Sequence, residues 1–550
     1  MPVIAPVIAP GQRPNWSTWL IWLALLAGVA LFSRPALPLD ETRYLSVAWE
    51  MWQRGDFLVP FKNGEAYSHK PPLLFWLIHL GWWVVGVNDW WPRLISPLLA
   101  LAGAWMTWRL AARLWPASPD SARFAPLVML SSLLWLVYGQ ALFFDVLIAI
   151  CAMIGLTALV EAALTGQRRW WAVFGLGIGL GLLAKGPAIL VHLLPAALLA
   201  PWWLRHAPNR PRWPRWYAGV GLGLLLGIAL ALIWAIPAGL HGGEAYRNAI
   251  FWGQTAGRMV QSFAHRLPAW WYLATLPVFL FPWLLWPRLL ASLAKTLRSE
   301  WRDAGIRFAL VWFAGGVLIF SAISGKQPHY LLPEFPAAAL LIGHALARNP
   351  VRSRPWLPGL ILIGLGLAVS YLVLGPVEAK GSLRFAEYLP DWAGAGFLLA
   401  GLLALSKAGH SLARVNRLAW ASLLAMLWLL FALVRPLSTA YDVAPMAREL
   451  ARHQALGHPV ANEGRYHAQF QFAGRLTRPL VALSGKELAD WLMIHPDGVA
   501  VVYLRSHEAA APYQPLFSHP YRGGTSILIG PRGAAAVTGQ APVPADEGEE

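Results

Sequence analysis

The sequence predicts a polytopic α-helical membrane protein with a smaller soluble α/β domain at its C-terminal end. Of the 550 residues, 57% are hydrophobic and the mean hydropathy is +0.48, values that a soluble globular chain does not reach. The apolar residues gather in stretches close to the roughly 20 residues that a membrane-spanning helix needs. This pattern stops at Pro436, where the hydropathy falls.

In chain order, these apolar stretches are the candidates for membrane helices. We expect the first apolar run, Trp19 to Phe32, to be retained rather than cleaved, because it lacks a strongly basic leader and a small-residue cleavage site. The candidate stretches are 16–33, 71–87, 92–115, 123–143, 146–165, 170–184, 187–204, 217–239, 270–290, 307–324, 330–347, 357–376, 393–407 and 417–434.

The stretch 71–87 decides the topology. If it crossed the membrane, every Arg-rich connector would face outward, against the positive-inside rule. We therefore predict an interfacial or re-entrant helix there, which leaves about 13 spans with the N-terminus inside. The net charge of +17 then comes mostly from cytoplasmic loops, whose basic residues face anionic lipid. Nucleic-acid binding is a poor explanation for it. The connectors placed inside carry Arg109, Arg113, Arg123, Arg168, Arg169, Arg205, Arg210, Arg212, Arg215, Lys295, Arg298, Arg302, Arg307, Arg348, Arg352, Arg354, Lys407, Arg414 and Arg417.

The C-terminal part has a different pattern. Short β-prone runs at Pro459–Asn462, Val499–Leu504 and Thr525–Ile529 alternate with helical segments at 443–455 and 485–493. We predict a membrane domain over 1–435 with an outer loop at 34–91, a soluble α/β domain over 436–530, and a disordered Ala/Gly/Pro-rich tail over 531–550. Cys151 is the only cysteine, which excludes an internal disulfide and a thiolate metal site.

A polar island from Leu39 to Pro72 interrupts the apolar pattern near the start of the chain. Its first half reads as a membrane-surface helix, capped by Asp40 and ended by Gly55. The apolar stripe of this helix is Tyr44, Val47, Ala48 and Met51. The alternative is a solvated loop with a surface helix.

The island also carries a family resemblance. The series DETRYLSVAWEMWQRGDFLVPFKNGEAYSHKPPLLFW resembles the first periplasmic loop of the aminoarabinose (lipid A) transferase branch of the polyprenyl-phosphate-dependent GT-C glycosyltransferases, a superfamily that includes the protein mannosyltransferases. The resemblance implies a GT-C membrane fold. It also implies transfer of a sugar from undecaprenyl phosphate to a membrane acceptor.

Three acidic residues, Asp40, Glu41 and Asp145, are candidates for the chemistry. Sugar transfer from a polyprenyl phosphate needs a group that orients or deprotonates the attacking oxygen. Asp40, next to Glu41, matches the family's catalytic aspartate, whereas from the residues alone a helix cap is the simpler explanation. Asp145 lies at the edge of an apolar run, where a charge usually faces a cavity or partner, or else caps the next helix.

Cationic and polar residues at outer helix ends are the candidates for donor binding. A leaving phosphate requires fixed cations, although a single lysine at a helix end is more often a membrane anchor. The resemblance extends through the patterns K-P-P, T-K-G and G-K-x-P-x-Y-x-L-P, and it implies donor phosphate or substrate binding by Arg43, Tyr44, Lys70, Lys185, Arg258, His265, Arg266, Lys326 and Tyr330.

Two departures from the family pattern bear on which sugar the protein recognises. The family is usually acidic where this chain has His69, and a glutamate is expected where it has Gln254.

We expect no required cofactor. A divalent metal is an alternative without a fixed ligand spacing such as HExxH, and its candidate ligands are Asp40, Asp145, His69 and His265.

These observations predict a bacterial inner-membrane glycosyltransferase with its active site and C-terminal domain in the periplasm. The expected partners are an undecaprenyl phosphate sugar donor, lipid A or another membrane glycolipid as acceptor, and membrane lipids; we expect a monomer that does not bind nucleic acid. One alternative is transfer of another sugar to a different glycolipid, polysaccharide or protein. A second is a lipid-linked sugar flippase, which would predict charges near mid-bilayer and repeated halves.

Overall fold

In the computed structural model, residues 14, 16–257, 266–375, 386–505 and 507–537 are described. They form two compact units. The first comprises 1–31, 93–236 and 253–433, and the second comprises 32–92, 237–252 and 434–550. The second unit therefore combines the C-terminal part with the polar island and a short segment near residue 240, both of which the sequence analysis assigned to the membrane domain.

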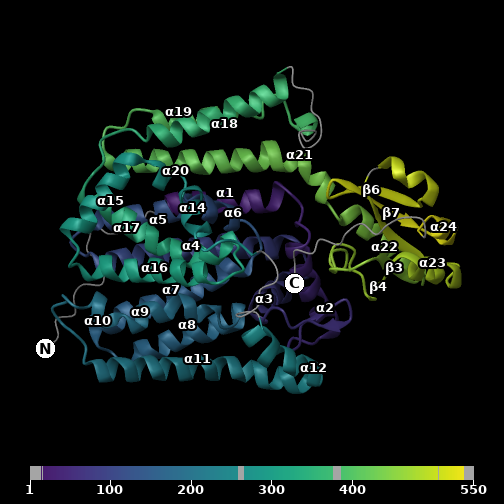
Figure 1. Cartoon of the computed structure of the whole chain (residues 1–550), viewed down its shortest axis with the longest axis horizontal. Helices are drawn as coiled ribbons and strands as arrows, with labels where there is room; N and C mark the ends of the chain where they lie inside the picture. Colours follow the sequence, from purple (N-terminus) through teal and green to yellow (C-terminus); the bar gives the residue numbers. More distant parts are fainter. Residues whose placement is uncertain (1–13, 15, 258–265, 376–385, 506, 538–550) are drawn as a thin grey trace. The chain divides into compact units, whose positions relative to one another are not determined.

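Helices make up the first unit, and they run side by side in Figure 1. Among the described residues of the chain, seven helices are long and apolar enough to cross a membrane. The helices of this unit are α1 (Trp16–Phe32), α4 (Trp90–Leu114), α5 (Pro119–Ser131), α6 (Leu133–Tyr138), α7 (Phe144–Thr165), α8 (Arg169–Lys185), α9 (Ala188–Leu198), α10 (Ala200–Trp203), α11 (Trp213–His241), α14 (Trp271–Phe279), η2 (Trp283–Leu285), α15 (Pro287–Ser299), α16 (Ala304–Ala322), η3 (Pro328–Glu334), α17 (Phe335–Arg348), α18 (Trp356–Leu374), α19 (Ala395–Leu405), α20 (Ser411–Trp428) and η5 (Leu429–Val434).

Small residues allow the closest helix packing in this unit. A Cβ added at Gly177 of α8 would lie 2.7 Å from the backbone nitrogen of Gly155 on α7. The two backbones therefore touch, as they do between membrane helices with small residues at the interface.

Several stretches expected as single helices are broken, among them 123–143 and 270–290. The stretch 123–143 divides at Ser132 into α5 and α6. The hydroxyls of Ser131 and Ser132 donate to the carbonyls of Leu127 and Val128, at 2.5 and 2.7 Å. The Ser132 N–H bonds to the Met129 carbonyl instead of to Val128, so the Ser132 hydroxyl takes its place. The stretch 270–290 divides near Pro282 and Pro287, because proline cannot donate to the preceding turn.

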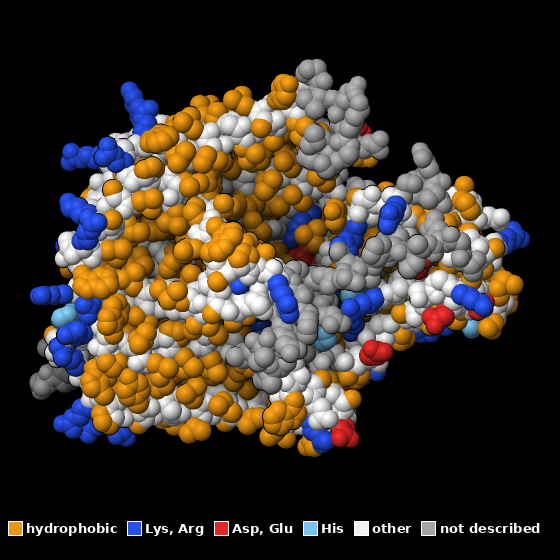
Figure 2. Space-filling model, in the orientation of Figure 1, with side chains coloured by type: hydrophobic (Ala, Val, Ile, Leu, Met, Phe, Trp, Pro, Cys, Tyr) orange, Lys and Arg blue, Asp and Glu red, His pale blue; other side chains and the backbone are white. Residues whose placement is uncertain are grey.

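Basic residues of the first unit gather at one end of its helices. The connectors after α10, α15 and α17, and the start of α20, lie at the left of Figure 1, and Figure 2 shows Lys and Arg side chains along that edge beside an apolar lateral surface. This is the arrangement that the topology argument requires of cytoplasmic loops.

The second unit begins with the polar island. It contains α2 (Asp40–Arg54), the hairpin β1 (Phe61–Lys62) and β2 (Glu65–Ala66), and α3 (Leu73–Val85). The predicted stripe of α2 is buried, and Gly55 ends the helix in the left-handed conformation. The prediction that Asp40 caps α2 is wrong: Leu39 is the capping residue and Asp40 is the first helical residue, with no capping hydrogen bond. Helix α3 has 13 residues, about 20 Å, which is too short to cross a bilayer core of roughly 30 Å.

The C-terminal part of the second unit is an α/β fold. Five strands are ordered β4-β3-β5-β7-β6, with β3 parallel to β4 and β5, and β7 antiparallel to β5 and β6. The remaining elements are α12 (Gly243–Asn248), η1 (Ala249–Gly257), which runs past the boundary between the units, α21 (Arg435–Leu437), η6 (Ser438–Tyr441), α22 (Ala444–Ala455), β3 (Val460–Glu463), β4 (Val481–Leu483), α23 (Gly485–Ile494), β5 (Val499–Leu504), η7 (His507–Tyr513), β6 (Phe517–Tyr521), β7 (Gly524–Ile529), η8 (Pro531–Gly533) and α24 (Ala534–Val537).

The expected disordered tail is in part ordered. Residues 531–537 form η8 and α24, and Ala534 and Val537 are buried in an apolar cluster with Leu488 and Ile527. Burial of these small apolar side chains against the sheet explains why the ordered fold extends beyond residue 530. Residues 538–550 lie outside the described part of the chain.

The segment between β3 and β4 packs onto α2 and the hairpin. The Ser46 hydroxyl donates to the Ala468 carbonyl at 2.6 Å, and the Trp49 indole donates to the Leu476 carbonyl at 3.0 Å. The amide of Asn63 donates to the Leu480 carbonyl and accepts from its backbone N–H, both at 2.8 Å. These bonds join the polar island and the C-terminal fold into one unit.

Candidate active site

Asp40 lies at the start of α2 with one carboxylate oxygen held and the other open. Its Oδ1 accepts from the Arg43 guanidinium at 2.6 Å and from the Tyr44 hydroxyl at 2.9 Å. Within the described part of the chain, Oδ2 has no hydrogen-bond partner, and the Asp40 side chain is 29% exposed. Burial, reinforced by the Asp40 charge, raises the pKa of Tyr44 well above its usual value, so the hydroxyl keeps the proton that it donates. The arrangement fixes a carboxylate with one oxygen available to a substrate.

Glu41 is engaged differently from its neighbour. Its carboxylate forms a buried, two-pronged ion pair with Arg34, one contact of which measures 3.0 Å, and it accepts from the Leu37 N–H at 2.8 Å. The Glu41 side chain is only 5% exposed. Its contacts secure the chain that leads into α2, which is a structural role.

Asp145 lies in the first turn of α7, in the first unit, and forms an ion pair with Lys185 at the end of α8. Phe143 is the capping residue of α7, so the alternative of Asp145 as a cap is wrong. The Lys185 ammonium lies 4.5 Å from the centre of the Tyr330 ring, close enough for a cation–π interaction. Three of the predicted residues, from α7, α8 and η3, are therefore brought together.

His329 joins this group, although the sequence analysis did not select it as a site residue. Its Nε2 lies 3.8 Å from Asp145 Oδ2, and its Nδ1 lies 3.4 Å from the Tyr138 hydroxyl. The signal was available, since His329 directly precedes Tyr330 in the G-K-x-P-x-Y pattern. A second buried pair was missed entirely: His192 Nδ1 lies 2.6 Å from Glu334 Oε1.

The other predicted donor-binding residues have varied surroundings. Lys326 is 3% exposed, and its ammonium donates to the carbonyls of Leu267 and Ile323 at 2.9 and 2.5 Å. Arg266 is exposed and pairs through its backbone with Gly325. Lys70 is half-buried just before α3. Arg258 and His265 lie outside the described residues, as does the side chain of Gln254.

The metal hypothesis finds no grouped ligands in the part of the chain that is described. No three His, Cys, Asp or Glu side chains there are placed to hold an ion. His69, a proposed ligand, stacks on the Tyr67 ring with a centroid distance of 5.3 Å. Of the other candidate ligands, His265 lies outside the described residues.

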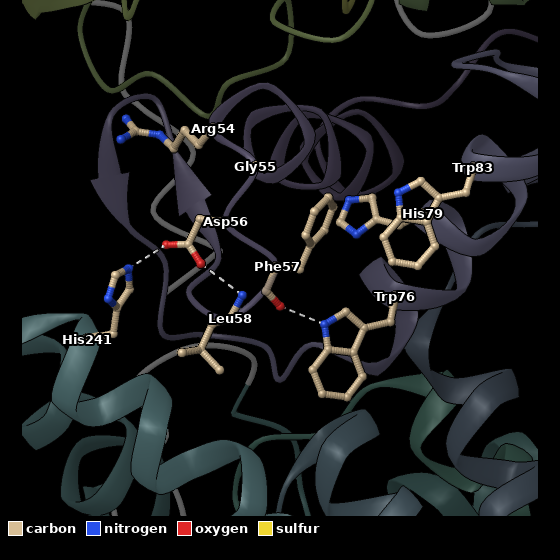
Figure 3. Close-up of a pocket in the computed structure, with 9 residues that line it drawn as sticks. All are labelled: Arg54, Gly55, Asp56, Phe57, Leu58, Trp76, His79, Trp83 and His241. Carbon is tan, nitrogen blue, oxygen red and sulfur yellow. Dashed lines mark hydrogen bonds and ion pairs between the residues drawn. The ribbon is translucent and has the colours of Figure 1, made fainter.

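An open pocket of about 810 Å³ lies in the second unit, beyond the C-terminal end of α2. Figure 3 shows Asp56 between His241 and the backbone N–H of Leu58, with distances of 3.2 and 2.9 Å. Aromatic side chains form much of its wall, among them Phe57, Trp76 and Trp83. The sequence analysis did not predict this pocket.

Comparison with known proteins identifies the fold first. Two crystal structures of ArnT from Cupriavidus metallidurans superpose on the chain, the apo form with a TM-score of 0.74 at 20% identity over 96% of this chain and 100% of that one. The form bound to undecaprenyl phosphate gives a TM-score of 0.70 at 19% identity, covering 94% and 98%. At these identities the likeness shows that the chain shares the fold of these membrane proteins.

The sequence comparisons then give the family. Residues 69–237 match the model described as dolichyl-phosphate-mannose-protein mannosyltransferase. The undecaprenyl phosphate-alpha-4-amino-4-deoxy-L-arabinose arabinosyl transferase of Pseudomonas aeruginosa strain UCBPP-PA14 is 30% identical over 94% of this chain and 98% of its own length. The chain belongs to this arabinosyl transferase family, which confirms the resemblance read from the polar island.

Proposed function

We propose that the chain transfers 4-amino-4-deoxy-L-arabinose from undecaprenyl phosphate to lipid A or a similar membrane glycolipid. The observation that carries this proposal is the Asp40 carboxylate, held on one oxygen by Arg43 and Tyr44 and open on the other. The family assignment supports it as well, since two of the arabinosyl transferases are each 30% identical to the chain over 94% of its length.

The transfer breaks the bond between C1 of the sugar and a phosphate oxygen, and it forms a bond between C1 and an acceptor oxygen. If the acceptor is a hydroxyl, Asp40 Oδ2 takes its proton; if it is a phosphate oxygen, no proton needs removal and Asp40 orients the acceptor. Undecaprenyl phosphate leaves with an added negative charge, which fixed cations stabilise. We assign this part to Lys70, which lies in the same unit as Asp40.

The proposal includes an orientation and a domain division. About 13 spans place the basic connectors in the cytoplasm and the polar island on the periplasmic side of the inner membrane. The α/β part over 436–530 then also lies in the periplasm, and the protein acts as a monomer. The single-sided basic end of the first unit supports this orientation.

A second candidate is transfer of a different sugar, favoured by His69. This residue stands where the family is usually acidic, and a stacked imidazole does not replace a carboxylate as a partner for the sugar's amino group. The two candidates differ in the donor, so one assay separates them.

The test uses purified full-length protein in lipid nanodiscs. We supply lipid A together with undecaprenyl phosphate carrying either aminoarabinose or a neutral pentose, and then measure the mass of the lipid A. With the aminoarabinose donor, we expect the wild type to raise the mass of lipid A by one aminoarabinose residue and Asp40→Asn to leave it unchanged. A gain from the neutral donor alone would support the second candidate. In a parallel preparation in sealed vesicles, movement of the donor across the bilayer without any product would indicate a flippase.

A further inference from the structure

The open pocket of the second unit, drawn in Figure 3, has no part in the transfer mechanism above. Its volume of about 810 Å³ lies within the range of roughly 300 to 1,000 Å³ that small-ligand sites occupy. Its lining comes from the end of α2, from the segment that follows, from α3 and from His241, all of which belong to the second unit. The chemistry of this lining indicates which ligand the pocket suits.

Asp56 supplies a carboxylate to the pocket. Its Oδ1 accepts from the backbone N–H groups of Leu58 and Val59 at 2.9 and 3.1 Å, and its Oδ2 lies 3.2 Å from His241 Nε2. The Asp56 side chain is 16% exposed, whereas the His241 side chain is 63% exposed. Because a carboxylate has about four acceptor positions, Oδ2 can accept from a ligand as well as from His241.

His79 of α3 places a second acceptor in the lining. Its Nε2 lies 2.8 Å from the Ala48 carbonyl, which can only accept, so this nitrogen carries the proton. Burial lowers the pKa of His79 to about 4, and the ring is therefore neutral at pH 7. Its Nδ1 is then an acceptor, and among the described residues it is buried without a hydrogen-bond partner. The lining thus favours a ligand that donates hydrogen bonds.

The charges of the lining favour a cation. Arg54 also lines the pocket, but its guanidinium donates to Glu50 Oε1 at 2.9 Å and lies 4.2 Å from the centre of the Phe61 ring. Figure 3 shows the Arg54 side chain pointing away from Asp56. The charge of Arg54 is therefore matched by Glu50, and the Asp56 carboxylate can form a charge-assisted hydrogen bond with a cationic ligand.

The aromatic part of the wall suits the same ligand. The Trp76 indole donates to the Phe57 carbonyl at 2.7 Å, and the rings of Phe57 and Trp83 lie 5.3 Å apart. Aromatic rings attract ammonium groups within about 6 Å of their centres. A primary ammonium combines this attraction with three N–H donors for the acceptors of the lining.

Helix α3 shows where such an ammonium comes from. Leu80, Trp83 and Val84 are 54%, 62% and 79% exposed, and their spacing places them on one side of the helix. The other side, with Ile78 and Trp82, is buried. An exposed apolar side of this kind is typical of a helix in the membrane surface, where tryptophan lies at the level of the lipid headgroups. Since Trp83 belongs to both this side and the pocket, a lipid headgroup can reach the pocket.

We propose that this pocket binds the ethanolamine headgroup of a membrane phospholipid, with the primary ammonium at Asp56 and against the aromatic wall. Binding there anchors the end of α2 and the start of α3 to the membrane surface. The sugar of the proposed donor also carries an ammonium, but Asp40 and Arg54 are the two ends of the 15-residue helix α2, about 21 Å apart. A sugar that reacts at Asp40 therefore does not occupy the pocket.

The experiment measures the binding of single lipids to the full-length protein in detergent micelles by native mass spectrometry. Phosphatidylethanolamine is compared with phosphatidylglycerol, which lacks the ammonium, and with phosphatidylcholine, whose ammonium has no N–H; the acyl chains are the same. We expect the wild type to bind phosphatidylethanolamine about ten-fold or more tightly than either of the others, since they lack the charge-assisted hydrogen bond to Asp56.

Two variants and a matched control assign this preference to the pocket. Asp56→Asn keeps an oxygen for the N–H groups of Leu58 and Val59 but removes the charge, and it should abolish the preference. Asp89→Asn should retain it, because Asp89 pairs with Arg475 in the same unit and does not line the pocket. Trp83→Leu leaves every contact of Asp56 in place and should weaken binding of phosphatidylethanolamine several-fold. Thermal unfolding reports whether each variant is folded, and if Asp56→Asn is not, Trp83→Leu decides.

Four results would overturn the inference. The first is equal binding of phosphatidylethanolamine and phosphatidylglycerol by the wild type. The second is an unchanged preference in the folded variants of Asp56 and Trp83. Binding of phosphatidylcholine as tight as that of phosphatidylethanolamine would show a site for any organic cation. Displacement of phosphatidylethanolamine by undecaprenyl phosphate aminoarabinose, and not by undecaprenyl phosphate, would assign the pocket to the sugar donor.

Discussion

Replacing Asp40 with asparagine should stop transfer without unfolding the protein. The change is nearly isosteric and removes only the charge. Two features of the structure keep the cost in stability small. Asp40 makes no capping hydrogen bond, and its ion pair with Arg43 is partly exposed, with side-chain exposures of 29% and 13%, so losing it costs about 1 kcal/mol or less.

The loss of activity should be much larger than this. A positioned carboxylate that accepts a proton contributes roughly 10²- to 10⁴-fold to a rate, which corresponds to about 2.7 to 5.5 kcal/mol of activation free energy. A native protein with about 5 to 15 kcal/mol of stability stays folded after losing 1 kcal/mol. Unfolding therefore cannot account for a loss of that size.

The assay is turnover at saturating donor, divided by the amount of folded protein. Asp120→Asn is a matched control, because Asp120 also lies in the first turn of a helix and pairs with an arginine three residues later, Arg123, at 3.0 Å. Tyr44→Phe should give a smaller loss, near ten-fold, since it removes one of the two hydrogen bonds to Oδ1. Near-normal turnover of Asp40→Asn would refute the reasoning and place the reacting carboxylate elsewhere.

Three other outcomes follow from the contacts described. Glu41→Gln should lower the free energy of unfolding by about 3 to 5 kcal/mol, since it breaks a buried ion pair; thermal unfolding checks this, and an unchanged Tm would contradict it. Lys185→Met should destabilise the protein, because it removes the ammonium that pairs with the buried Asp145. Adding Asp145→Asn should restore the Tm but not the turnover, and recovery of both would make the pair purely structural. Asp89→Cys in a Cys151→Ala background should react with an impermeant thiol reagent from the periplasm; reaction only after the inner membrane is permeabilised would reverse the topology.

Local patterns in the sequence predicted local structure well. The stripe of α2 and its end at Gly55 follow from residue spacing and from the conformational freedom of glycine. Strand β5 was predicted with its observed bounds, because its residues are an uninterrupted buried β-prone run. Strands β4 and β6 were missed: the first is short and exposed at Val481, and the second contains Pro520.

Contacts between distant segments left no local signal. An aspartate just before an apolar stripe is typical of a helix cap, so Asp40 was given that interpretation. Its contacts with Arg43 and Tyr44 distinguish it from a capping residue. The break at Ser132 depends on serine hydroxyls bonding back to the preceding turn, which the hydropathy of the stretch does not reveal. The grouping of α2 with the segment after β3 could not be inferred from either sequence alone.

The contact between α2 and the C-terminal fold also has a consequence in time. Ser46 and Ala468 are 422 residues apart. At a synthesis rate of about 5 to 20 residues per second, roughly 20 to 80 s pass between the emergence of one partner and the other. During that interval α2 is outside the ribosome, and the segment to which Ser46 and Trp49 bond is not yet translated. Because the lipid surface is the nearest apolar phase, α2 would wait there until the last fifth of the chain arrives.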